Sequence, residues 1–154
     1  MFIKRTTVRL TLTKENHMTT ESEQAKAIAH RFHVEVWEKH NLEILKELVH
    51  PDFQPTTDNA SKGSEAARDF LETLFAAFPD LNSTQEDLIG EGNKAVLRWT
   101  IRATHTGTLW GMPPTGKKIE IAGMDILEIQ DGKIAKDYGG IGDQMPKLME
   151  QLKG

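Results

Sequence analysis

The sequence predicts an α+β domain in which helices come first and a curved antiparallel sheet follows. In the first half of the chain, apolar residues recur every three or four positions, which is the spacing of amphipathic helices. From Leu81 onward the spacing changes to two, as in half-buried strands. The chain has 154 residues, of which 38% are hydrophobic, so it suits one domain with a sizeable core. Helices followed by consecutive strands are typical of the α+β class.

Three helices are expected before the sheet. The first begins at Thr20 with a capping box, and its apolar stripe runs to Trp37. A shorter helix covers residues 42–49 and ends before Pro51, because proline lacks a backbone donor and restricts the residue before it. The third helix carries the clearest stripe, over residues 67–78.

Consecutive antiparallel strands are expected in the second half. Residues 93–105 alternate between apolar and polar, and the segment before them, which ends at GEGN, can be their hairpin partner. The next strand, 117–129, follows a loop rich in glycine and proline. Asp131-Gly132 is a hairpin signal that leads into residues 133–140, and a final helix closes the chain.

Residues 1–19 are interpreted as an extension, and residues 20–154 as the domain. Within the extension, Val8, Leu10 and Leu12 alternate with polar residues. The segment is therefore either a short edge strand or a disordered or non-native start. It lacks the continuous apolar stretch of a signal peptide.

Composition argues against several functional classes. The net charge is -4 and no dense basic run is present, so nucleic acid is a poor candidate partner. No apolar run approaches the roughly 20 residues that cross a bilayer, and no membrane partner is expected. The absence of cysteine excludes a thiolate nucleophile and fits a reducing compartment, so a cytoplasmic location is expected.

Asp125 is the most informative polar residue, because its position in the strand has the parity of an apolar face. The residues that share this parity are Ile119, Ile121, Leu127 and Ile129. A carboxylate in such a face costs free energy unless it is bonded, paired or protonated. Asp125 is therefore either a shielded structural carboxylate or an acid–base group in a pocket, where burial raises its pKa toward neutrality.

Asp137 and His105 are candidate partners of Asp125. Regular pairing about the turn places Asp125 opposite residue 138, so that Asp137 lies within one residue of that position. Two neighbouring carboxyl groups would share a proton, whereas the alternative for Asp137 is an exposed edge-strand residue. His105 has an inward parity and is either a hydrogen-bonded core residue or part of a proton-transfer pair.

Five further residues are candidate ligand contacts. Trp37 and Trp99 lie on inward faces and either pack in the core or stack on a ligand. The others are Phe53, Gln54 and Tyr138.

Neither a metal nor an organic cofactor is expected. His30 and His33 are three residues apart, but no HExxH pattern accompanies them. The GGIG segment does not follow the GxGxxG pattern, and no serine lies in GxSxG.

Four segments, in order, resemble the SnoaL-like polyketide cyclase or ester cyclase family. They are HPDF (50–53), AAFPDL (76–81), THTGTLWGMPPTGKK (104–118) and DGKI…GDQMPKLMEQL (131–152). The third segment is the most specific of them. The resemblance spans residues 22–152 and implies an NTF2-like, cystatin-type cone: a curved sheet wrapped over N-terminal helices, with a deep apolar pocket and a homodimer formed through the sheet.

The resemblance also implies a cofactor-free aldol ring closure in which an aspartate moves protons beside a histidine. The family's catalytic aspartate, eight positions beyond Asp131, falls on Gly139, whereas its histidine falls on Asp125. Asp125 or Asp137, oriented by His105, is expected to take a proton next to a carbonyl or to activate water. The expected function is a cyclase, isomerase or hydrolase acting on a hydrophobic carbonyl or ester compound; a non-catalytic ligand-binding module and a dimeric scaffold are the alternatives.

Overall fold

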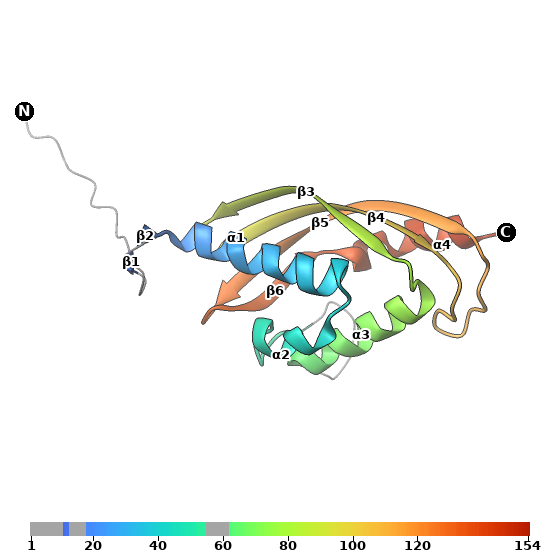
Figure 1. The fold of residues 1–154 in the computed structure, drawn as a ribbon, viewed down its shortest axis with the longest axis horizontal. Coiled ribbons are helices and arrows are strands. Elements are labelled where there is room, and N and C mark those ends of the chain that lie inside the picture. The colour runs from blue at the N-terminus through green and yellow to red at the C-terminus, as the bar shows by residue number, and fades with distance from the viewer. Residues whose placement is uncertain (1–10, 13–17, 55–61) are drawn as a thin grey trace, which may run out of the picture.

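The computed structural model describes residues 11–12, 18–54 and 62–154. Its main feature is a four-stranded antiparallel sheet in the order β3-β4-β5-β6, which arches over α1 and α3 (Figure 1). The strands are β3 (Asn82–Glu91), β4 (Lys94–Thr104), β5 (Lys118–Gln130) and β6 (Lys133–Gly139). The α+β fold with a curved sheet over N-terminal helices is confirmed.

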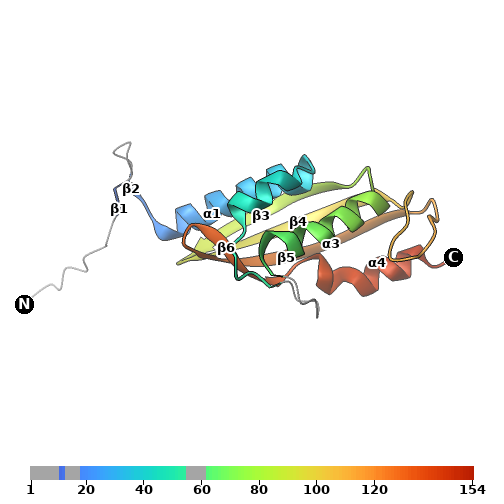
Figure 2. The same ribbon diagram turned by 90° about the horizontal axis from the view of Figure 1, so that it is seen from below.

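The helices lie against one face of the sheet, which is called the inner face below, and the view in Figure 2 shows α1 and α3 along it. They are α1 (Glu21–Phe32), the π-helix η1 (His33–Glu38), the 3-10 helix η2 (Leu42–Ile44), α2 (Leu45–Leu48), α3 (Gly63–Ala77), the 3-10 helix η3 (Ile141–Gln144) and α4 (Met145–Leu152). No helix within the described ranges is long and apolar enough to cross a membrane.

Helix α1 begins as predicted. Thr20 Oγ1 accepts a hydrogen bond from Glu23 N over 3.2 Å, and Glu23 Oε2 accepts one from Thr20 N over 3.1 Å. The end of the expected first helix is instead the π-helix η1, a rare form that often occurs at functional sites. Val36 and Trp37, which are adjacent in η1, are both buried.

Little of the N-terminal extension lies within the described residues. Thr11–Leu12 (β1) pairs with Met18–Thr19 (β2) as a short antiparallel ladder. The rest of the expected edge strand lies outside the described residues.

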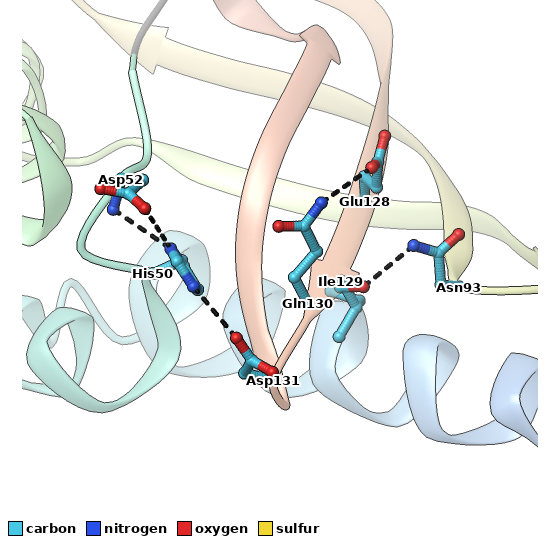
Figure 3. Close-up of polar contacts among 7 residues, drawn as sticks. All are labelled: His50, Asp52, Asn93, Glu128, Ile129, Gln130 and Asp131. Atoms are coloured by element: carbon cyan, nitrogen blue, oxygen red, sulfur yellow. Dashed lines mark hydrogen bonds and ion pairs between the residues drawn. The ribbon is translucent and has the colours of Figure 1, made fainter.

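The hairpin of β5 and β6 turns at Asp131-Gly132, as predicted. Both residues have positive φ angles, 51° and 73°, as in a type I′ turn. Figure 3 shows how neighbouring segments hold this end of the hairpin: His50 Nε2 lies 3.4 Å from Asp131 Oδ2, and Asn93 Nδ2 donates to the Ile129 carbonyl oxygen over 3.0 Å. The Asn93 carbonyl oxygen accepts from Ile129 N over 2.8 Å.

A β-bulge at Ala135 changes the register of this hairpin. Next to the turn Ile129 pairs with Ile134, but the next pair is Glu128 with Lys136. Ala135 is left without a partner, and it is buried together with the adjacent Ile134. Because side chains alternate between faces, the extra residue reverses the facing of all later residues in β6 relative to a regular hairpin.

The bulge turns Asp137 toward the inner face. Asp137 pairs with Leu127, which is 1% exposed, and Asp125 pairs with Gly139. The predicted register, with Asp125 opposite residue 138, was wrong by one position. In that register Asp137 would have faced the opposite side from Asp125.

Candidate active site

A cleft lies between the end of α1, η1, α3 and the segment that joins β6 to η3. Its cavity volume is about 100 Å³. Its lining is mostly apolar and consists of Phe32, Trp37, Phe53, Ala67, Phe70, Leu71, Asp125, Asp137, Gly139, Ile141 and Gly142. Two aspartates are therefore the charged lining residues, and no cationic residue occurs among these lining positions.

Asp125 is 4% exposed and is held by an indole. Trp99 Nε1 donates a hydrogen bond to Asp125 Oδ2 over 2.9 Å. Trp99 lies opposite Gly123 in the ladder, and a Cβ at position 123 would approach the Trp99 ring to 2.8 Å. Gly123 therefore leaves the room that the indole needs to reach Asp125.

Asp137 is half-buried, but its Oδ1 atom is shielded from solvent and has no hydrogen-bond partner among the described residues. Burial, the negative charge of Asp125 and the hydrogen bond between the two side chains raise the pKa of Asp137 to about 10. Burial also raises the pKa of Asp125, which the hydrogen bonds from Asp137 and Trp99 oppose. At neutral pH the aspartate pair, Asp125 and Asp137, therefore shares a proton.

The backbone at Gly140 fits closely against the aspartate pair. Gly140 has a φ of 87°, and a Cβ on it would overlap Asp125 Oδ1 and lie 3.2 Å from Asp137 Oδ2. Asp143, which is exposed in η3, adds negative charge that raises the pKa of both aspartates. Glycine at position 140 is thus required both by its conformation and by the carboxyl groups beside it.

His105 lies elsewhere in the structure. Its side chain is fully buried, and its Nδ1 accepts from Thr115 N over 3.2 Å and lies 3.0 Å from Thr115 Oγ1. Asp125 is opposite Leu97, eight residues before His105 in the chain, or about 26 Å along an extended strand. The structure does not bring His105 together with the aspartate pair, and His105 does not line the cleft.

Of the four expected aromatic contacts, Trp37 and Phe53 line the cleft, whereas Trp99 and Tyr138 do not. The Trp37 ring also packs edge-to-face on Phe75, with ring centroids 5.9 Å apart. Trp99 is 3% exposed and does not line the cleft, since it lies behind Asp125 as a hydrogen-bond donor.

Gln54 and Tyr138 are exposed and do not line the cleft. Tyr138 follows Asp137 in a strand, so it points to the opposite face, where it is 47% exposed and donates to Glu128 Oε2 over 3.0 Å. The inward facing of Asp137 thus places Tyr138 outside.

Sequence reasoning missed Phe32 and Phe70 as cleft residues, because both belong to apolar helical stripes and looked like core positions. It also missed the contact of Trp99 with Asp125. The shared inward parity of these two residues on neighbouring strands was a signal that could have found it.

The two histidines at metal-like spacing have other partners. His30 Nδ1 lies 2.9 Å from Gln85 Oε1, and His33 Nε2 lies 3.2 Å from the Ser83 carbonyl oxygen. Burial lowers the pKa of His33. Within the described residues, no group of three or more His, Asp or Glu side chains is arranged to hold a metal ion.

A family model and solved structures place this chain among known proteins. The model of the family described as SnoaL-like polyketide cyclase matches residues 27–152. No curated protein matches the sequence significantly.

Solved structures share the fold. TsrD from Streptomyces laurentii is 25% identical, with a TM-score of 0.73 over 84% of this chain and 94% of TsrD. A Jannaschia sp. CCS1 protein assigned as a SnoaL-like polyketide cyclase is 21% identical, with a TM-score of 0.75 over 87% of this chain and 94% of that chain. AclR from Streptomyces galilaeus, assigned as a hydroxylase, is 25% identical, with a TM-score of 0.65 over 82% of this chain and 96% of AclR.

The family match extends from within α1 to the end of α4 and includes the aspartate pair and the cleft. It confirms the resemblance carried by the four sequence segments. The chain belongs to the SnoaL-like polyketide cyclase family.

Proposed function

We propose that this protein is a cofactor-independent acid–base enzyme of the cyclase type that acts on a small uncharged carbonyl or ester compound. The observation that carries the proposal is the aspartate pair in an apolar cleft. Because the two carboxyl groups share a proton, one is a base and the other an acid in the same site. Family membership supports the cyclase type of reaction.

The pair has the groups that an aldol ring closure needs. The Asp125 carboxylate takes a proton from the carbon next to a substrate carbonyl, which gives an enolate. The enolate carbon forms a bond to a second carbonyl carbon, whose oxygen takes the electron pair and is protonated by Asp137. Transfer of the first proton from Asp125 to Asp137 restores the pair, so the product is an isomer of the substrate and nothing is oxidised or reduced.

The lining of the cleft favours an uncharged substrate. A carboxylate or phosphate on the ligand would lie near Asp125 and Asp143 without a cationic partner among the lining residues. The aromatic rings of Phe32, Trp37 and Phe70 favour a planar apolar compound.

The test is conversion of a panel of uncharged diketo esters, followed by mass spectrometry and chromatography. We expect Asp125→Asn and Asp137→Asn each to lower the rate of cyclisation by about 100-fold or more, the usual contribution of a general acid or base. Asp52→Asn is the matched control, because the Asp52 side chain is 86% exposed. Wild-type rates in both pair variants would overturn the proposal.

A ligand-binding module without activity is the second candidate. The observation that favours it is Gly139 at the position where the resemblance places the catalytic acid. Calorimetric binding of an uncharged ester by the wild type, with no conversion of any panel member, would support this candidate.

We also propose a homodimer formed through the outer face of the sheet. Large apolar side chains are exposed there on three strands: Ile89 is 61% exposed, Met124 is 49% exposed and Tyr138 is 47% exposed. The cytoplasmic location stays a prediction.

A further inference from the structure

We infer that Trp99 is a positioning residue that decides which member of the aspartate pair holds the shared proton. The inference concerns the same site as the proposed function, and its consequence for catalysis rests on that function. The order of protonation itself does not depend on turnover.

The indole of Trp99 is fixed in place. Its ring is 3% exposed and occupies the space that a side chain at position 123 would need. Gln144 Cγ lies 3.2 Å from that same Cβ position, so η3 closes over this part of β5. Trp99 Nε1 therefore keeps its 2.9 Å contact with Asp125 Oδ2.

The donor acts on one member of the pair only. Asp125 receives the indole N–H, whereas Asp137 Oδ1 has no partner in the described part of the chain. An indole N–H is a donor with no acceptor capacity, so it stabilises a carboxylate and offers nothing to a carboxyl proton pointing toward it. The contact therefore favours the state in which Asp125 is ionised and Asp137 is protonated.

Other groups that face the pair do not reverse this preference. The cleft residues of α1, η1 and α3 are apolar or aromatic. The negative charge of Asp143, in η3, raises the pKa of both aspartates. Asp143 provides no N–H donor to either carboxylate, so it does not favour ionisation of Asp137 over Asp125. Among the described residues, Trp99 and the Asp137 proton are the donors to Asp125.

The arrangement separates the two chemical roles. Asp125, anchored by Trp99, is the base, while Asp137, which lines the cleft and holds the proton, is the acid. Loss of the indole N–H would leave the proton distributed over both carboxyl groups, and a fraction of the molecules would have the roles exchanged.

The experiment is a carboxyl titration of the full chain by NMR with carbon-13 in the aspartate side chains, without substrate. Asp125→Asn and Asp137→Asn assign the two signals. Trp99→Phe removes the N–H and keeps an apolar ring, and we expect it to raise the proton affinity of Asp125 about tenfold, as for a carboxylate that loses one hydrogen bond. Trp110→Phe is the matched control, because Trp110 is 55% exposed in a loop and should leave the titration unchanged.

A Trp99→Phe protein that retains its near-ultraviolet circular dichroism and titrates like the wild type would overturn the inference. If Trp99→Phe does not fold, the wild type provides the test: the nitrogen-15 signal of Trp99 Nε1 should shift in step with the Asp125 titration. A Trp99 signal that is constant across that titration would overturn the inference as well. Since neither readout needs turnover, failure of this inference and failure of the proposed enzyme activity are distinguishable.

Discussion

Asp125 and Asp137 face the same cleft from neighbouring strands although they are not opposite each other in the ladder. Asp125 pairs with Gly139, and Asp137 pairs with Leu127, so the aspartates are diagonal neighbours on the inner face. Side chains in this relationship are within reach of each other. Gly140, which follows β6, leaves the space beside the two carboxyl groups free of a side chain.

Asp137→Asn should make the protein more resistant to alkaline pH. The folded state raises the pKa of Asp137 to about 10, so the native protein binds this proton more tightly than the unfolded chain does. Wild-type stability should therefore fall as the pH rises from about 4, the unfolded value, toward 10. The variant lacks this loss and should gain up to about 1.4 kcal/mol per pH unit over the wild type, or up to roughly 5 kcal/mol between pH 5 and pH 9.

Urea denaturation at pH 5, 7 and 9 measures this difference. Asp52→Asn, at an exposed site, should follow the wild type. Parallel stability profiles of Asp137→Asn and the wild type would show that Asp137 is not protonated in the folded protein.

Gly140→Ala should damage the aspartate pair. The new Cβ would overlap Asp125 Oδ1, and the residue would have to keep a φ of 87°. Gly111→Ala is a close control, since Gly111 has a φ of 83° and no other atoms within 4 Å of a Cβ placed on it. Both variants should lose about 1 kcal/mol or more from backbone strain, but only Gly140→Ala should change the aspartate titration. Equal titrations in the two variants would contradict the close packing at Gly140.

Deletion of Ala135 should remove the bulge and leave Asp137 facing the cleft. The ladder then becomes regular, with Lys136 still opposite Glu128 and Asp137 still opposite Leu127. The pKa of Asp137 should therefore stay raised in the deletion protein. Carbon-13 titration of Asp137 is the measurement, and an Asp137 that titrates as an exposed aspartate in a folded Ala135 deletion would contradict the pairing of Asp137 with Leu127.

Met124→Glu should weaken the proposed dimer. A charge at this outward position in β5 would have to be desolvated at the interface. Light scattering after size-exclusion chromatography should give a dimer for the wild type and a lower mass for the variant. Lys133→Glu, placed at the hairpin end, controls for added negative charge; a monomeric wild type would exclude the dimer.

The sequence predicted the elements well, because their signals are local. The capping box at Thr20, the type I′ turn at Asp131-Gly132 and the inward parity of Asp125 all depend on a few adjacent residues. The bulge at Ala135 has no such local signal, and it alone decides which way Asp137 faces.

The composition of the cleft was harder to predict from the sequence. Apolar periodicity shows that Phe32 and Phe70 point inward, but a residue that lines a void has the same pattern as one that packs in the core. His105 has the expected inward parity, yet parity does not report position along a strand, and its backbone pairs with Lys117, far from Asp125 in the ladder.

Infrared difference spectroscopy tests the central claim most directly, because it distinguishes a protonated carboxyl group from a carboxylate. At pH 7 the wild type should show the carbonyl band of one buried protonated carboxyl group, and this band should be absent from Asp137→Asn. A wild-type spectrum without that band would mean that both aspartates are ionised in the cleft, and it would contradict the acid–base pair.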